Sequence, residues 1–137
     1  MIPKQLVKPK SRVTTLFSDM TIRQAIERMN KSRFQMVPVL EKDSGRYLYS
    51  LSAGDILKHI VTAGSYERSL DNPISSIPID RLIIPATNDI SMEMLVDLLA
   101  NQNYVPIVDN GGIFGGIITR KSALYHLIKT EEEEENA

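Results

Sequence analysis

Hydrophobic and polar positions follow the same order twice along this chain of 137 residues. Residues 13–22 read as a strand, a turn and the start of a helix, and residues 83–92 repeat that order 70 positions later. Thr21 and Ser91 take corresponding places, and both residue types favour the N-cap of a helix. Apolar residues then recur at helical spacing, as Ile22, Ala25, Ile26 and Met29 and as Met92, Leu95, Val96 and Leu99. The pattern predicts an internal repeat.

A second group of elements follows each of these helices. A short apolar strand that contains a proline leads into turn residues and a return strand. Each return strand ends in a hydroxyl residue, Ser52 or Thr119, which opens another amphipathic helix. The predicted strands are residues 36–40 and 47–51 in the first copy and 104–108 and 113–118 in the second. Each copy therefore predicts the order β-α-β-β-α.

The repeat predicts an α/β (α+β) fold of two pseudo-symmetric halves packed sheet to sheet. Neither half, at about 60 residues, buries enough surface to be stable alone, so we expect one domain. The predicted boundaries are a first repeat in residues 1–64, a connector in 65–81 and a second repeat in 82–130. Residues 131–137 contain five consecutive glutamates and predict a disordered acidic tail.

Charge and composition exclude several classes of protein. The formal net charge is -1, and it becomes about +4 without the five tail glutamates, which suits a small anionic ligand better than a nucleic-acid polymer. The chain has no cysteine, which removes disulfides, thiolate metal sites and cysteine nucleophiles. No apolar run approaches the roughly 20 residues that cross a bilayer. We expect a cytoplasmic protein without a membrane partner.

The order of strand, helix, proline-containing strand, hairpin and Ser/Thr-x-x-Asp resembles the CBS-domain repeat, and two such repeats in tandem resemble a Bateman module. The resemblance covers residues of about 10 to 129 and rests on residues 33–39 with 52–55 and on residues 104–109 with 116–122. It implies a regulatory sensor of adenine nucleotides that is not an enzyme. Such a sensor would bind the nucleotide in the cleft between the repeats and signal to an effector protein that the sequence does not name.

The second copy resembles a narrower group within that family. It is two residues shorter before its proline and reads Gly-Ile-Ile-Thr-Arg-Lys from Gly116, as in the stand-alone bacterial CBS proteins that bind cyclic di-AMP (the DarB and CbpB type). The first copy departs from this group because it keeps Asp55. The family usually has a glycine three residues before the Ser/Thr, which the second copy keeps as Gly116, whereas the first copy has Tyr49 there. The choice between cyclic di-AMP and AMP, ADP or ATP stays open.

Ser52 and Asp55 lie at i and i+3 on one helix face. The carboxylate can accept two hydrogen bonds from the 2′- and 3′-hydroxyls of a ribose. The same pair is also typical of a plain helix N-cap with an acid in the first turn. Both interpretations stay open.

The matching place in the second half combines hydroxyls with two cations. Thr119, Arg120 and Lys121 stand at a helix start, where backbone N–H groups favour an anion such as phosphate. Alternatively, both basic side chains extend into water. Ser122 replaces the acid and removes a charge that would repel phosphate.

The base is expected to meet the strands. A proline in a strand removes one backbone N–H from the sheet and favours a strand at the edge of the sheet. In one interpretation, this leaves nearby backbone groups free to bind the hydrogen-bonding edge of adenine. In the other, the proline marks only an edge strand. Phe34 and Tyr104 could stack on a base or pack in the core, and Arg12 could add a phosphate contact. The predicted base contacts lie near Val13, Thr14, Gln35 and Pro38 in one half and Ile83, Ile84, Tyr104, Val105 and Pro106 in the other.

No catalytic or metal-binding residue is predicted. His59 and His126 each follow a helix start, but zinc needs three or four ligands and no further cluster appears. The main alternative to a nucleotide sensor is a structural dimerisation module without a physiological ligand. In both cases we expect a homodimer through the apolar helices around Ile56, Ile60, Leu124 and Leu127.

Overall fold

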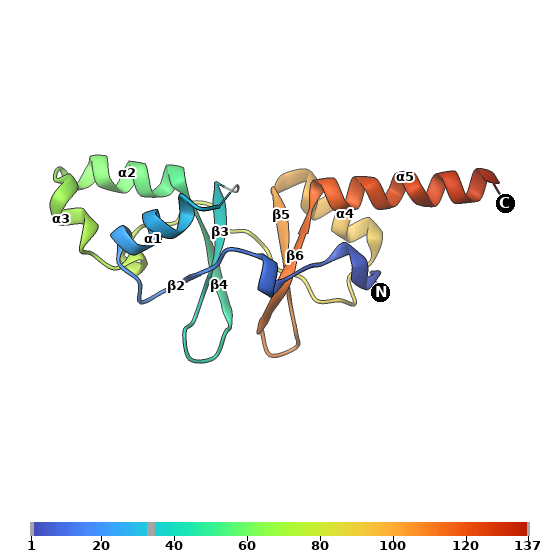
Figure 1. Ribbon diagram of the computed structural model, residues 1–137, viewed down its shortest axis with the longest axis horizontal. Helices are drawn as coiled ribbons and strands as arrows, with labels where there is room; N and C mark the ends of the chain where they lie inside the picture. Colours follow the sequence, from blue (N-terminus) through green and yellow to red (C-terminus); the bar gives the residue numbers. More distant parts are fainter. Residues whose placement is uncertain (1, 33–34, 137) are drawn as a thin grey trace. The chain divides into compact units, whose positions relative to one another are not determined.

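The computed structural model describes residues 2–32 and 35–136, which form two compact units (Figure 1). The first-repeat unit is Thr14–Leu82, and the second-repeat unit combines Met1–Val13 with Ile83–Ala137. Each unit contains a three-stranded sheet and helices. The predicted mixed α/β fold with two repeats is confirmed, and the packing of sheet on sheet stays a prediction.

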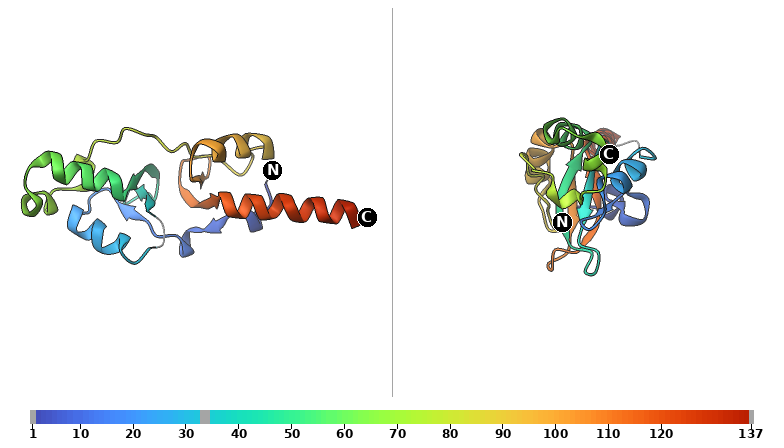
Figure 2. Two further views of the ribbon diagram at one scale, coloured as in Figure 1. Left: turned by 90° about the horizontal axis from the view of Figure 1, so that it is seen from above. Right: turned by 90° about the vertical axis from the view of Figure 1, so that its left-hand side faces the viewer.

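The first-repeat unit has the strand order β2-β3-β4, with β2 parallel and β4 antiparallel to the central β3. Its helices lie on one side of the sheet (Figures 1 and 2) and bury apolar residues such as Ile22 and Ile56 against it. The elements are β2 (Leu16–Phe17), α1 (Ile22–Met29), β3 (Met36–Leu40), β4 (Tyr47–Ser52), α2 (Ala53–Ala63), α3 (Tyr66–Leu70) and the 3₁₀ helix η3 (Ile74–Ser76).

The second-repeat unit has the strand order β1-β6-β5, and both pairs are antiparallel. A single parallel bridge between Ala86 and Ile107 takes the place that β2 has in the other unit. The elements are the 3₁₀ helices η1 (Lys4–Leu6) and η2 (Lys10–Arg12), then β1 (Lys8–Pro9), α4 (Met92–Asn101), β5 (Tyr104–Val108), β6 (Phe114–Thr119) and α5 (Arg120–Asn136).

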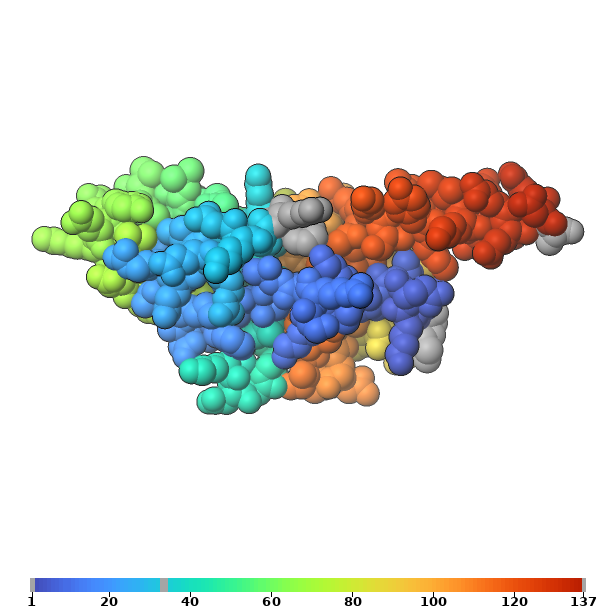
Figure 3. All heavy atoms as spheres, in the orientation of Figure 1, coloured from blue at the N-terminus to red at the C-terminus, as the bar shows by residue number. Residues whose placement is uncertain are grey.

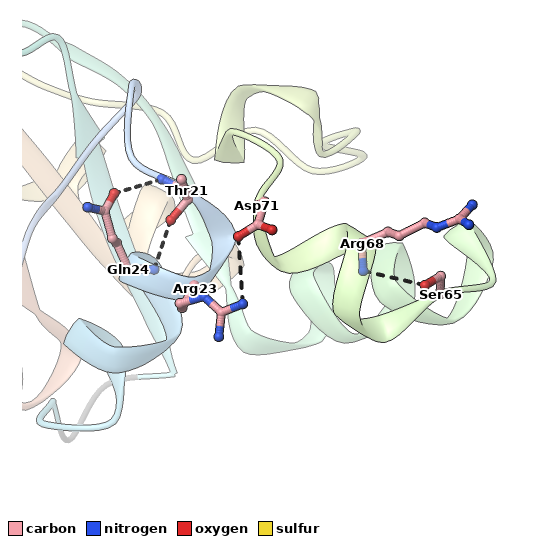
Figure 4. A network of polar contacts seen from close by, with 6 residues as sticks. All are labelled: Thr21, Arg23, Gln24, Ser65, Arg68 and Asp71. Atoms are coloured by element: carbon pink, nitrogen blue, oxygen red, sulfur yellow. Dashed lines mark hydrogen bonds and ion pairs between the residues drawn. The ribbon is translucent and has the colours of Figure 1, made fainter.

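The helix starts are capped as the sequence predicts. Thr21 forms a capping box with Gln24, in which each backbone N–H donates to the other residue's side chain at 3.2 and 3.0 Å (Figure 4). Ser91 caps α4 in the same place of the second repeat. An ion pair of 3.6 Å between Arg23 and Asp71 lies nearby, and its exposure leaves it a small contribution to stability.

The segment that precedes each repeat packs against the other repeat's core. A 3₁₀ turn follows Pro3 and another follows Pro73, 70 residues later. Leu6 is buried in the second-repeat core and Ile74 in the first-repeat core. Residues 2–13 therefore pack with the second repeat in the structure, and the first-repeat boundary at residue 1 stays a prediction.

The predicted disordered tail is helical in the structure. Helix α5 continues to Asn136, and its last turns project from the second-repeat unit in the space-filling view (Figure 3). Glutamate is a good helix former, and extension of an existing helix avoids the cost of nucleation. These two effects explain why a charged run that reads as disordered can continue a helix.

Gly116 on β6 sets how closely the N-terminal segment can approach. A Cβ atom at this position would meet the Lys8 carbonyl oxygen and would lie 2.7 Å from Val7 Cγ1. Strand β4, the return strand of the first repeat, lies at an edge of its described sheet, which explains why Tyr49 is tolerated at the matching position. Glycine at 116 is thus required by strand β1.

We expect Gly116→Ala to displace β1 and to lower the free energy of unfolding by about 1–3 kcal/mol, the usual cost of overpacking. Urea denaturation measures this change. Gly115→Ala is the matched control, because its Cβ would have its nearest neighbour at 3.7 Å, an ordinary contact. Equal stability of the two variants would contradict the role given to Gly116.

Candidate functional site

Ser52 and Asp55 lie where β4 meets α2 and form a complete capping box. Ser52 Oγ accepts a hydrogen bond from the Asp55 N–H, and Asp55 Oδ2 accepts one from the Ser52 N–H, both at 3.0 Å. The N-cap interpretation is therefore confirmed. The cap uses one carboxylate oxygen, and Asp55 Oδ1 has no hydrogen bond to any residue that the structure describes. That oxygen remains available to a ligand.

Asp55 lines a cavity of about 210 Å³ within the first-repeat unit, together with Lys58, His59, Thr62, Pro78 and Asp80. The Lys58 ammonium already pairs with Asp80 at 3.1 Å. His59 Nε2 is buried and has no hydrogen-bond partner among the described residues. Two carboxylates against one paired cation favour a donor such as a sugar hydroxyl over a phosphate. The volume is below the roughly 300–1,000 Å³ of a whole ligand pocket, so it suits part of a nucleotide.

The second repeat builds the same cap without the charge. Thr119 Oγ1 accepts from the Ser122 N–H at 3.1 Å and donates to Ser122 Oγ at 3.0 Å. Two neutral hydroxyls thus occupy the place of a hydroxyl and a carboxylate.

The two basic residues that follow Thr119 differ in their surroundings. Arg120 Nε donates to the Leu99 carbonyl oxygen at 2.7 Å, near the end of α4, where such carbonyls lack helical partners. Lys121 is exposed and makes no ion pair with a residue in the described ranges. Arg120 therefore stabilises the fold, and its interaction was not predicted from the sequence. Neither residue makes an ion pair with another described residue, so both keep an unpaired positive charge at this helix start, and only the Arg120 side chain is held by a hydrogen bond.

Most residues predicted to face the base are buried within their own units. Pro38, Val105 and Pro106 are fully buried, and Tyr104 and Ile83 are almost so. The Tyr104 ring thus packs in the core, which was one of its two predicted roles. Gln35 and Ile84 are exposed, Arg12 is exposed at the end of η2, and Val13 and Thr14 are half-buried. Phe34 lies outside the described residues.

The prediction that proline marks an edge strand is wrong for the first repeat. Pro38 lies in β3, the central strand of its sheet. It is tolerated there because β2 begins only at Leu16, so the missing N–H falls just outside the parallel pairing.

Gln102 is a buried residue that the sequence analysis missed. Its side-chain amide accepts from the Ile84 N–H at 3.1 Å and donates to the Ile84 and Tyr104 carbonyl oxygens at 2.8 and 3.0 Å. The backbone of Ile84, which the sequence assigned to the base, is thus already occupied. A polar residue two positions before an apolar strand was the available signal.

Two tyrosines on β4 have shifted ionisation. Burial raises the pKa of Tyr47 to about 12, against a smaller opposite effect of its hydrogen bond with Ser50. Burial also raises the pKa of Tyr49. Both phenols are therefore neutral at ordinary pH.

Among residues 2–32 and 35–136, no three His, Asp or Glu side chains gather closely enough to hold a metal ion. No helix in these ranges combines the length and the apolar character needed to span a bilayer.

Comparison with known proteins matches this chain to CBS domains. A family model described as the CBS domain matches residues 4–62. A crystal structure of CbpB in complex with c-di-AMP superposes with a TM-score of 0.84 at 18% identity, covering 96% of this chain and 87% of CbpB. No curated protein sequence matches the chain.

Two further solved structures share the fold. CbpB from Listeria monocytogenes in complex with c-di-AMP has a TM-score of 0.77 and 22% identity, and covers 92% of this chain and 94% of its own. CBSX2 in complex with AMP has a TM-score of 0.72 and 14% identity, with coverage of 93% and 96%. At these identities the likeness shows the fold.

The double role of Asp55 makes its two simplest variants distinguishable. Asp55→Ala should lower the free energy of unfolding by about 1 kcal/mol, because the α2 cap loses its reciprocal bond. Asp55→Asn should cost less, since an amide oxygen can still accept from the Ser52 N–H. Urea denaturation of both variants checks this, and equal losses would show that the carboxylate charge, rather than the hydrogen bond, holds the cap.

Proposed function

We propose that this chain, whose residues 4–62 match the CBS-domain model and which has the fold of the CbpB structures, is a non-enzymatic sensor of an adenine nucleotide. Binding of the nucleotide would change its contact with a protein partner in the cytoplasm. The observation that carries the proposal is the Asp55 carboxylate, of which the α2 cap uses only one oxygen and which lines a cavity together with Lys58, His59 and Asp80. Solved structures of the same fold contain c-di-AMP or AMP, which supports an adenine nucleotide as the ligand.

The two repeats offer different chemistry to such a ligand. In the first, Ser52 and Asp55 offer acceptors for sugar hydroxyls. In the second, Thr119 and Ser122 offer hydroxyls and Lys121 offers an exposed cation beside a helix N-terminus, which suits phosphate. Arg120 would assist mainly by holding α4 in place.

We favour cyclic di-AMP over AMP, ADP or ATP. Its 3′-oxygens are esterified, so it has no free vicinal diol for a carboxylate to grip, and its two phosphates call for cations and hydroxyls. The second repeat has these groups. Asp55 remains the feature that argues for AMP or ADP.

Calorimetric titration of two variants separates these ligands. If cyclic di-AMP is the ligand, Lys121→Ala should weaken its binding by about 1–3 kcal/mol, the scale of a charge-assisted hydrogen bond, and by more than Asp55→Asn does. Added salt should weaken binding of the unmodified chain. Lys129→Ala removes the same charge farther along α5 and should leave the affinity unchanged.

Two other results would contradict parts of this proposal. Tight AMP binding that depends on Asp55, with no heat from cyclic di-AMP, would contradict the choice of cyclic di-AMP but not the proposed role as a nucleotide sensor. A thermal-shift panel in which AMP, ADP, ATP and cyclic di-AMP all leave the melting temperature unchanged would contradict the sensor itself, because a ligand that binds only the native state must stabilise it.

A structural dimerisation module is the second candidate function, and exposed apolar residues favour it. Leu57 and Val61 on α2 are 64% and 72% exposed, and Leu124 and Leu127 on α5 are also exposed. Ile56 and Ile60, which the sequence assigned to the interface, instead pack in the first-repeat core. We propose a homodimer that covers the exposed set, with or without a ligand.

Sedimentation at tens of micromolar should give twice the chain mass of 15.4 kDa. The double variant Leu57→Glu/Val61→Glu should be monomeric, because charge on an apolar contact is costly to bury. Leu48→Glu on β4, where the leucine is 43% exposed, is the control and should stay dimeric. A monomeric unmodified chain, with and without nucleotide, would refute the dimer.

A further inference from the structure

A parallel pair of strands requires an N–H donor at every second residue of each strand. In the second repeat this ladder is present at Ala86, whose N–H donates to the Pro106 carbonyl oxygen and whose carbonyl accepts from the Val108 N–H, both at 2.9 Å. The next step of the same ladder would join Ile84 to Tyr104 and Pro106. It cannot form completely, because Pro106 has no N–H to give to the Ile84 carbonyl.

Gln102 fills this gap with its side chain. Its amide meets both backbone groups of Ile84 and also the Tyr104 carbonyl, at the distances given above. The residue is only 5% exposed, so its amide is held inside the unit. The Ile84 N–H, the Ile84 carbonyl and the Tyr104 carbonyl, which lack partners in the strand pairing, thus all have a hydrogen-bond partner.

The first repeat has the same gap without the same filler. Leu16 pairs with Val39 as Ala86 pairs with Ile107, so Thr14 corresponds to Ile84, and Pro38 to Pro106. Thr14 makes no hydrogen bond to another described residue. Counting back from the two prolines, position 34 corresponds to Gln102, and it is a phenylalanine, whose side chain has no hydrogen-bonding group.

The amide of glutamine and one edge of adenine carry the same pattern. Each places an N–H donor beside an acceptor, which is why a glutamine side chain and an adenine edge can both form two bonds at once with a matching donor and acceptor. The N–H and C=O of a single residue such as Ile84 or Thr14 form such a matching pair.

We propose that Gln102 closes the base position of the second repeat from within, so that of the two positions only the backbone of Thr14, which the sequence already assigned to the base, stays open to adenine. This inference rests on the proposed function, and it adds that each chain reads one adenine through its backbone. A second adenine, as in cyclic di-AMP, would then be held by other contacts.

Amide hydrogen exchange followed by NMR tests the inference on the unmodified chain. On saturation with cyclic di-AMP, and separately with AMP, exchange of the Thr14 N–H should slow by about tenfold or more, because it gains a partner. The Ile84 N–H should already be protected and should not change, and the Gln102 side-chain amide signals should stay in place. A matching response of Ile84 and Thr14, or no response of Thr14 while nucleotide binds, would overturn the inference.

A pair of variants gives a second measurement. Gln102→Leu should expose the Ile84 N–H to exchange and raise the AMP bound per chain from one to two in calorimetry. Asn103→Leu removes a neighbouring exposed amide and should change neither quantity. Two AMP per unmodified chain would contradict the inference, and so would a folded Gln102→Leu chain that still binds one. If that variant does not fold, the exchange data on the unmodified chain decide.

Failure of the proposed function has a different signature. In that case neither AMP nor cyclic di-AMP produces heat or changes any amide of the unmodified chain. Binding with the wrong pattern of protection rejects only the role of Gln102 and Thr14.

Discussion

The missing N–H of one proline interrupts the parallel ladder at the same place in both repeats, and the site depends on what fills that gap. Pro38 and Pro106 are fully buried, so the backbone groups opposite them cannot simply turn to water without cost. In the second repeat the chain supplies its own partner through Gln102. In the first repeat the matching backbone at Thr14 has no such partner among the described residues. Backbone groups that lack a partner in the sheet can instead form hydrogen bonds with a flat heterocycle such as adenine.

The caps of the equivalent helices are a second difference between the two repeats. Ser52 with Asp55 and Thr119 with Ser122 cap equivalent helices, yet only the first pair carries a charge. The capping role alone fixes the side chains in place, so a ligand meets groups that are already ordered and loses little entropy on binding them. A pseudo-symmetric fold can therefore offer two chemically different faces, one rich in acceptors and one with hydroxyls and an unpaired lysine.

The sequence was sufficient for features that depend on local periodicity and capping. The repeat, its order of elements and the caps at Thr21, Ser91, Ser52 and Thr119 all follow from residue type and spacing. Contacts between distant segments were not predictable in this way. The packing of residues 2–13 with the second repeat, and the bond from Arg120 to Leu99, depend on three-dimensional proximity that no short-range pattern encodes. Gln102 was missed because its role is to form hydrogen bonds with the backbone of Ile84 and Tyr104. The need for these bonds can be recognised only when the strand register is known.

We propose above all that an adenine nucleotide is held by the Thr14 backbone and the Asp55 cap. A crystal structure of the chain grown with cyclic di-AMP tests this most directly. We predict an adenine edge hydrogen-bonded to Thr14, sugar oxygens near Ser52 and Asp55, and the Gln102–Ile84 bonds intact. Adenine bound at Ile84 with Gln102 displaced, or a nucleotide that touches neither Thr14 nor Asp55, would contradict it.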